Sequence, residues 1–76
     1  MVEAFILVQT DVGKASQVAG KIALLPGIRT AEDVVGPYDV IARASADSDS
    51  ALAEVVTAVQ AIDGITRTLN CTVAGS

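Results

Sequence analysis

Residues 24–28 (LLPGI) and residues 61–65 (AIDGI) carry the same short pattern, and this pattern decides the fold of the chain. In each copy a Gly follows an apolar, helix-like stretch and precedes an Ile that opens a strand-like run. Proline cannot continue the hydrogen-bond ladder of a helix, and glycine readily adopts the conformation that closes one, so Pro26-Gly27 marks a helix end. Gly27 and Gly64 lie 37 positions apart (64 minus 27). The sequence therefore predicts two repeats of a strand-helix-strand unit.

Hydrophobic spacing on either side of each repeat predicts the remaining elements. Apolar residues recur at helical spacing over residues 14–25 and from Leu52 to Ile62, and residues 47–50 (DSDS) supply oxygens that cap the second helix. Strands are predicted at residues 2–9, 28–35, 38–46 and 65–74. Gly36-Pro37 forms the turn between the second and third strands. The order βαββαβ predicts a ferredoxin-like α+β sandwich, in which a four-stranded antiparallel sheet carries both helices on one face.

Alternation along the last strand predicts which side chains face the helices and which face the open side of the sheet. The row that suits the helix-packed core contains Ile65, Leu69, Cys71 and Val73, so Cys71 is expected to be a small core residue. Arg67 interrupts that row and is expected to reach out from the edge or to pair with Glu54. The opposite row, predicted to face the open side, contains Thr66, Thr68, Asn70, Thr72 and Ala74. Small Ala residues of the third strand, beside these Thr residues, would let a second sheet approach closely.

Composition favours self-association and argues against nucleic-acid binding. The length of 76 residues fits a single domain over residues 1–76. Hydrophobic residues make up 51% of the chain. A domain of this size buries only about 60% of its unfolded surface, so part of the apolar surface is expected in a homo-oligomer interface. The alternative is a monomer, because many of these residues are Ala, which tolerates exposure. A net charge of −4 repels phosphate backbones, so direct binding to nucleic acid is not expected.

Few residues suit catalysis or metal binding. The chain has no His and one Cys, which excludes an internal disulfide and an ordinary zinc site, and no cofactor is expected. Without His, an activated nucleophile or a phosphate loop, an enzyme is not expected, although Tyr38 and Asp39 could form an acid/base pair in a small ferredoxin-like enzyme. No apolar run reaches the length of a membrane span and no secretion signal is visible, so a cytoplasmic protein without membrane contact is expected.

Residues 34–42 (VVGPYDVIA) place Tyr38 and Asp39 directly after the turn, at the start of an apolar strand. An acid in this position loses hydration unless a partner restores its hydrogen bonds. Two interpretations stay open from the residues alone. In the first, Gly36-Pro37 is a tight turn and Asp39 caps the backbone or pairs with Arg43. In the second, these residues form part of a binding site.

Four segments together resemble the effector-binding domain of the Lrp/AsnC (feast/famine) transcription regulators, often called the RAM domain. They are LPGI after the first helix, VVGPYDVIA at the hairpin, DSDSALAEVV into the second helix, and IDGITRTLNCTV at the end. The resemblance covers essentially the whole chain. Full-length regulators of that family carry a helix-turn-helix domain before this region, so the chain is expected to be a stand-alone RAM domain that does not bind operator DNA itself.

The resemblance implies dimers formed by sheet-to-sheet packing, assembly of dimers into rings that are commonly octamers, and an amino-acid effector held between subunits. It places Gly36, Tyr38 and Asp39 in the effector pocket. Asp39 would accept hydrogen bonds from an α-ammonium group, amides near Gly36 would receive the carboxylate, and Tyr38 would form a wall. Polar residues of a neighbour's last strand would complete the site, with Thr68, Asn70 and Thr72 as the candidates. A full-length Lrp/AsnC regulator is an expected partner. Alternatives are an ACT-like regulatory domain and a ligand-free assembly scaffold.

Overall fold

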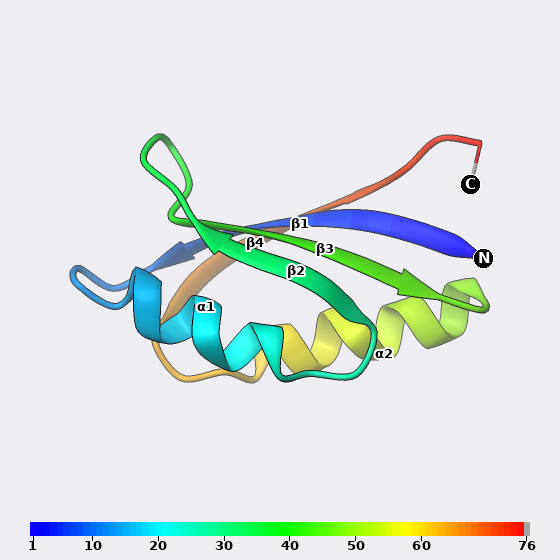
Figure 1. Ribbon diagram of the computed structural model, residues 1–76, viewed down its shortest axis with the longest axis horizontal. Coiled ribbons are helices and arrows are strands. Elements are labelled where there is room, and N and C mark those ends of the chain that lie inside the picture. Colours follow the sequence, from blue (N-terminus) through cyan, green and yellow to red (C-terminus); the bar gives the residue numbers. More distant parts are fainter. Residues whose placement is uncertain (76) are drawn as a thin grey trace.

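Both halves of the chain run strand, helix, strand, and together they build one curved sheet with both helices beneath it (Figure 1). The computed structural model describes residues 1–75. Over these residues the elements are β1 (Val2–Thr10), α1 (Ala15–Ala23), β2 (Ile28–Asp33), β3 (Val40–Ala46), α2 (Asp49–Gln60) and β4 (Ile65–Thr72). The sheet order is β2-β3-β1-β4, and every neighbouring pair is antiparallel. The predicted ferredoxin-like α+β fold is confirmed.

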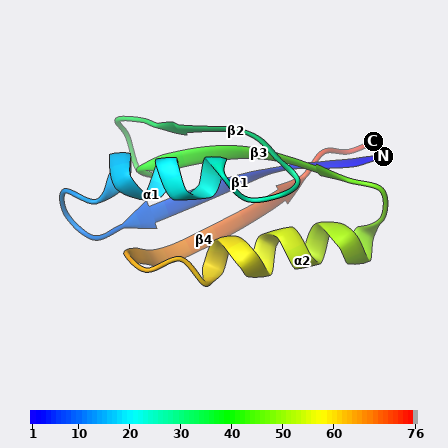
Figure 2. The same cartoon turned by 60° about the horizontal axis from the view of Figure 1, so that its bottom comes forward.

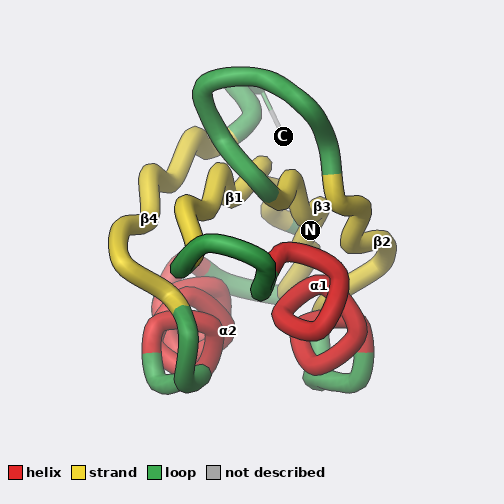
Figure 3. Tube along the Cα trace, turned by 90° about the vertical axis from the view of Figure 1, so that its left-hand side faces the viewer, coloured by secondary structure: helices red, strands yellow, loops and turns green. Residues whose placement is uncertain are grey.

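The hydrophobic core lies between the sheet and the helix layer. Viewed along the strands, the sheet crosses the middle of the molecule with both helices below it (Figure 3). The sheet contributes Ala4, Ile6, Val8, Val40, Ala42 and Ala44, and the helices contribute Val18, Ala19, Ile22, Leu52 and Val59. Alternate residues of β1 and β3 therefore point toward the helices, as the period of two along a strand requires. The N-terminus and the end of β4 lie at the same end of the sheet (Figure 2).

The side chains of β4 were assigned to the wrong faces of the sheet over most of the strand, because β4 contains an extra residue near its start. Ile65 pairs with Thr10, whereas Arg67 already pairs with Gln9, so Thr66 has no partner position on β1. Such a bulge shifts every later side chain to the other face of the sheet. Thr68, Asn70 and Thr72 consequently pair with Val8, Ile6 and Ala4, and face the helix side. Arg67, Leu69 and Cys71 face the open side.

Three further expectations are wrong. Cys71 is exposed and is not a core residue. Arg67 lies on the open face beside Gln9, on the opposite side of the sheet from Glu54 of α2, so the predicted pairing is not formed. The Ala residues of β3 were expected to line a surface for a second sheet. They instead pack against the helices, and Ala42 and Ala44 are fully buried. On β3, the helix-packed positions after Val40 hold Ala, whereas Ile41 and Arg43 face outward.

Boundaries differ from the predicted ones mainly at residues 34–39. Strand β2 ends at Asp33 and β3 begins at Val40, so Val34, Val35 and Tyr38, predicted within strands, belong to a longer hairpin connection. The start of α2 follows the prediction, since the Ser48 Oγ accepts a hydrogen bond from the Ala51 amide at 3.2 Å. Ser48 is therefore the N-cap residue of α2.

Gly27 connects the end of the α1 region to β2 in a place that admits no side chain. Its φ is +89°, and a Cβ there would lie 2.6 Å from Val55 Cγ2 and 3.3 Å from the Ser45 carbonyl oxygen. Its own carbonyl accepts a hydrogen bond from the Ser45 amide at 2.8 Å. The Gly of the LPGI pattern is thus required both by its backbone conformation and by close packing against α2 and β3.

Replacing Gly27 with Ala is expected to lower the free energy of unfolding by at least about 2 kcal/mol, because left-handed backbone strain and overpacking add. Gly20→Ala is the matched control. Gly20 lies within α1, and a Cβ there would meet nothing within 4 Å outside its own helix, so Ala should stabilise the helix by about 0.5–1 kcal/mol. Urea unfolding at one protein concentration measures both. Equal stability of the two variants would contradict this role of Gly27.

Candidate functional site

The hairpin connection at residues 34–39 is joined to the end of β1 by side chains as well as by backbone. The Thr10 amide donates a hydrogen bond to Asp39 Oδ2 at 2.8 Å, and the Asp39 amide donates to the Val8 carbonyl at 2.9 Å. The Val34 amide donates to the Asp39 carbonyl at 2.9 Å and closes the base of the hairpin. Asp39 therefore connects three segments: β1, β3 and the limb of the hairpin that leaves β2.

This geometry confirms a structural use of Asp39, although not the predicted pairing with Arg43. Arg43 instead contacts Glu3, with its Nη2 2.9 Å from Glu3 Oε1. The carboxylate of Asp39 caps a backbone amide, and a carboxylate has room for several donors on its two oxygens. Within residues 1–75, Oδ2 accepts the bond from Thr10 and no donor contacts Oδ1.

Neighbouring residues of the hairpin present further unused donors. The amides of Val35, Gly36 and Tyr38 donate to no other group among residues 1–75, and Pro37 has no amide hydrogen. Gly36 has a φ of 158°, which side-chain-bearing residues rarely adopt. Gly36 and Pro37 are exposed, while Tyr38 and Asp39 are half-buried. Gly36, Tyr38 and Asp39 thus lie together at one corner of the sheet, which has an acceptor and amide donors, and their ligand role stays a prediction.

The β4 candidates lie elsewhere. Thr68, Asn70 and Thr72 occupy the edge strand on the helix side of the sheet, and Thr68 Oγ1 accepts a hydrogen bond from Gln60 Nε2 of α2 at 2.9 Å. The hairpin rises from the opposite side of the sheet (Figure 3). One copy of the chain therefore does not unite the two groups, and a ligand role for these β4 residues stays a prediction.

Sequence reasoning missed the apolar surface on the open side of the sheet. Its residues, named here the open-face patch, are Phe5, Leu7, Ile41, Leu69 and Cys71. Phe5, Ile41 and Leu69 expose 39%, 36% and 42% of their surface, which is high for large apolar side chains. The uninterrupted apolar run from Ala4 to Val8 was the available signal, because a strand that is apolar on both faces is typically covered on both.

A charged pair borders the open-face patch. Arg43 Nε and Nη2 donate to Glu3 Oε1 at 3.2 and 2.9 Å, and the Arg43 guanidinium carbon lies 5.5 Å from the centre of the Phe5 ring. Stacking on an aromatic ring and two hydrogen bonds to one carboxylate hold the guanidinium against the sheet. The surface is therefore apolar at its centre, with an ordered ion pair at one side.

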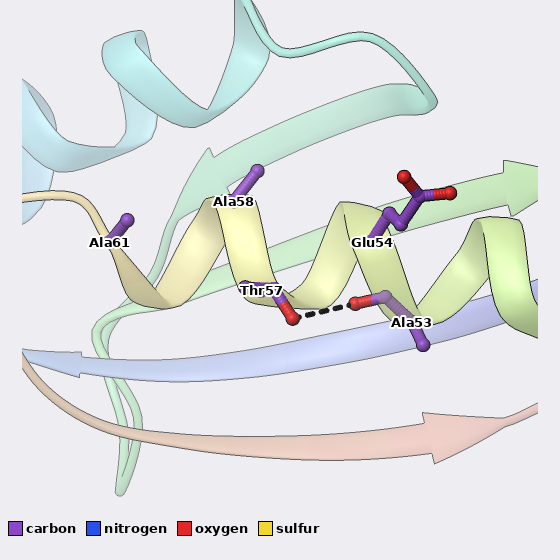
Figure 4. Close-up of a pocket in the computed structure, with 5 residues that line it drawn as sticks. All are labelled: Ala53, Glu54, Thr57, Ala58 and Ala61. Carbon is purple, nitrogen blue, oxygen red and sulfur yellow. Dashed lines mark hydrogen bonds between the residues drawn. The ribbon is translucent and has the colours of Figure 1, made fainter.

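A hollow on the helix layer has no comparable chemistry. Ala53, Glu54, Thr57, Ala58 and Ala61 line it along the outer side of α2 (Figure 4). The Thr57 hydroxyl donates back to the Ala53 carbonyl at 2.9 Å, as the dashed line in Figure 4 shows, so it is occupied within the helix. Small apolar side chains and one carboxylate give little means of orienting a ligand. The hairpin corner and the open-face patch are the stronger candidates.

Comparison with known proteins assigns this fold to a family. The family model described as the Lrp/AsnC ligand binding domain matches residues 3–74 of the chain. The chain belongs to the Lrp/AsnC ligand-binding domain family. This is a family of regulatory ligand-binding domains and not of enzymes. The Lrp/AsnC resemblance expected from the four sequence segments is confirmed. No curated protein gives a significant match.

Solved structures share the Lrp/AsnC domain fold along nearly the whole chain. The hypothetical protein PHS023 from Pyrococcus horikoshii is 30% identical, with a TM-score of 0.91, over 100% of this chain and 93% of that one. AsnC from E. coli is 23% identical with a TM-score of 0.87, over 99% of this chain and 52% of AsnC. The transcriptional regulator NMB0573 from Neisseria meningitidis, in complex with L-Met, is 18% identical with a TM-score of 0.82, over 99% and 51%.

The chain spans about half the length of AsnC and of NMB0573, whereas PHS023 is nearly the same length as this chain. Within residues 1–75, neither helix of the domain is long and apolar enough to cross a membrane.

Asp39→Ala is expected to lower the free energy of unfolding of this Lrp/AsnC domain by about 1–3 kcal/mol, because the half-buried Thr10 amide loses its acceptor. Asp39→Asn keeps an acceptor oxygen in the same place and should lose less than half as much. Thermal unfolding of both variants, followed by circular dichroism, measures the difference. If the Asn and Ala variants are equally destabilised, the carboxylate oxygen does not cap Thr10.

Proposed function

We propose that the chain is an amino-acid-sensing module that self-associates through the open face of its sheet. The observation that carries this proposal is the open-face patch, which neither α1 nor α2 covers. Phe5, Leu7 and Leu69 lie on adjacent strands in direct register, Leu7 opposite Leu69 and Phe5 opposite Cys71. Packing such a surface against its copy in a second molecule removes apolar area from water on both sides, which a two-fold dimer achieves with a single patch.

The chemistry of the hairpin corner suits a free amino acid. Asp39 Oδ1 supplies an acceptor for an α-ammonium group, and the amides of Val35, Gly36 and Tyr38 supply donors for an α-carboxylate. The phenol ring of Tyr38 provides an apolar wall with a polar tip. The corner is open to solvent, so a neighbouring copy would be needed to enclose the side chain of the effector. The L-Met complex of NMB0573, which shares the fold, supports this class of ligand.

Regulation would arise from the assembly. An effector shifts an equilibrium between two assembly states only if it binds one of them more tightly. A site enclosed by two copies meets this condition, because it exists only in the assembled state. The chain matches the half of E. coli AsnC that corresponds to the ligand-binding domain, so an Lrp/AsnC regulator with a like surface is a proposed partner as well.

Leu69→Lys is expected to raise the dissociation constant of the dimer at least about tenfold, because a charge would be buried in place of an apolar side chain. Leu24→Lys is the control. Leu24 is 85% exposed at the end of α1, on the helix side, and its replacement should leave association unchanged. Sedimentation equilibrium of the wild type and both variants measures this. A monomeric wild type at every concentration would refute self-association.

Native mass spectrometry with a mixture of amino acids is expected to retain one amino acid on the assembled wild type. Asp39→Asn should weaken that binding about 10–100-fold, because a charge-assisted hydrogen bond to the ammonium is lost while the bond from Thr10 is kept. Asp33→Asn, on the exposed end of β2, is the matched loss of one carboxylate and should bind normally. An assembly that retains no amino acid would instead indicate a scaffold without a ligand.

A further inference from the structure

Arg67 lies on the open side of the sheet, at the end of β4 that is close to the hairpin corner. The bulge at Thr66 turns its side chain away from the helices, and Arg67 pairs in register with Gln9 of β1. Gln9 in turn donates from Nε2 to the Pro37 carbonyl of the hairpin at 3.0 Å. The hairpin itself rises on the side away from the helices (Figure 1). Hairpin, Gln9 and Arg67 therefore follow one another across this end of the sheet.

The guanidinium of Arg67 has no partner among residues 1–75, in contrast to that of Arg43. Arg43 forms an ion pair with Glu3, whereas the exposed side chain of Arg67 contacts no acid and donates no hydrogen bond within that range. Glu32 also faces the open side, but it lies on β2, and the sheet order β2-β3-β1-β4 places two strands between it and β4. Arg67 is therefore a cation that is available to a ligand.

Two strand spacings separate Asp39 from Arg67. Asp39 lies beside Gln9, because its amide donates to the Val8 carbonyl and its Oδ2 accepts from the Thr10 amide. Strand β4 is the next strand beyond β1. At about 4.8 Å per spacing, the backbones of Asp39 and Arg67 lie roughly 10 Å apart. The side chain of a ligand held at Asp39, together with the long side chain of Arg67, can span this distance.

We propose that Arg67 binds the side-chain carboxylate of the effector, so that the site selects an acidic amino acid, aspartate or glutamate. This assignment rests on the proposed amino-acid site at the hairpin corner and names its class of ligand. With the ammonium group at Asp39 and the α-carboxylate at the amides around Gly36, the side chain of the ligand would run over Gln9 toward Arg67. The guanidinium would then donate two parallel hydrogen bonds to the second carboxylate.

Charge matching favours acidic ligands over the other amino acids. Each charged group of an acidic amino acid would have a complementary group in the site, whereas a neutral side chain would leave the guanidinium of Arg67 without a counter-charge. A basic side chain would be repelled by Arg67. The net charge of −4 opposes the approach of an anion. Salt screens that repulsion beyond about 8–10 Å, so the close contact with Arg67 decides the preference.

Isothermal titration calorimetry with L-glutamate and L-glutamine tests the assignment, because the two ligands have nearly the same shape and differ by one charge. The wild type should bind L-glutamate at least about tenfold more tightly, since L-glutamine forms no charge-assisted pair with Arg67. The preference should shrink as salt is added, because salt screens the attraction between exposed charges. L-Aspartate and L-asparagine give the same comparison for a shorter side chain.

Arg67→Gln removes the charge and keeps a polar side chain, so it should reduce the preference for L-glutamate over L-glutamine to about twofold or less. Arg67→Lys keeps the charge but loses the paired donors, and should show an intermediate preference. Arg29→Gln is the matched control. Arg29 is exposed near the start of β2, at the other edge of the sheet, and its loss should leave the preference unchanged.

The possible results separate the role of Arg67 from the amino-acid site on which it rests. A wild type that binds L-glutamine as tightly as L-glutamate would overturn the role of Arg67 and leave the amino-acid site in place. The same holds if Arg67→Gln weakens both ligands equally, or if Arg29→Gln removes the preference to the same extent. A wild type that binds no amino acid would overturn the role of Arg67 together with the site.

Discussion

The structure depends on one strand that is apolar on both of its faces. β1 lies inside the sheet between β3 and β4, and its side chains alternate between the helix layer and the open side. Ala4, Ile6 and Val8 are buried against the helices, while Phe5 and Leu7, at the alternate positions of the strand, face outward. Because both helices lie on one face, no helix covers the outward half of the apolar content of β1. A second molecule is the simplest way to supply that cover.

At the hairpin corner, Asp39 has a structural hydrogen bond and is also proposed to bind the effector. Asp39 gives one carboxylate oxygen to the Thr10 amide and so fixes where the hairpin leaves the sheet. The bond joins the base of the hairpin to the end of β1. The structural hydrogen bond of Asp39 and its proposed ligand contact use different carboxylate oxygens, so the two interpretations that the sequence left open are compatible. A binding residue held by a structural hydrogen bond is also preorganised, because less freedom is lost when a ligand binds.

Much of the fold could be predicted because its signals are local. The helical stripes, the Ser48 cap and the helix end at Pro26-Gly27 are signalled by residues close in sequence, and they identified both helices and the order βαββαβ. Gly36, Tyr38 and Asp39 could be grouped for the same reason, since they are near neighbours along the chain. The pairing of Arg43 with Glu3 could not be found in this way, because it joins residues from different strands that only the register of β1 and β3 brings together.

By itself, the sequence determined the elements, their order, the positions that require glycine and a surplus of apolar surface. Only the tertiary structure decided where that surplus lies. The bulge at Thr66 shifts the side chains of β4 by one position, which sends Thr68, Asn70 and Thr72 to the helix side and Leu69 and Cys71 to the open face. Either row of β4 side chains could face the helices without breaking the alternation of the strand, so the residues of β4 alone do not determine which row does. Pairing with β1 fixes it, because Ile65 must join the core beside Thr10 while Leu69 lies opposite Leu7.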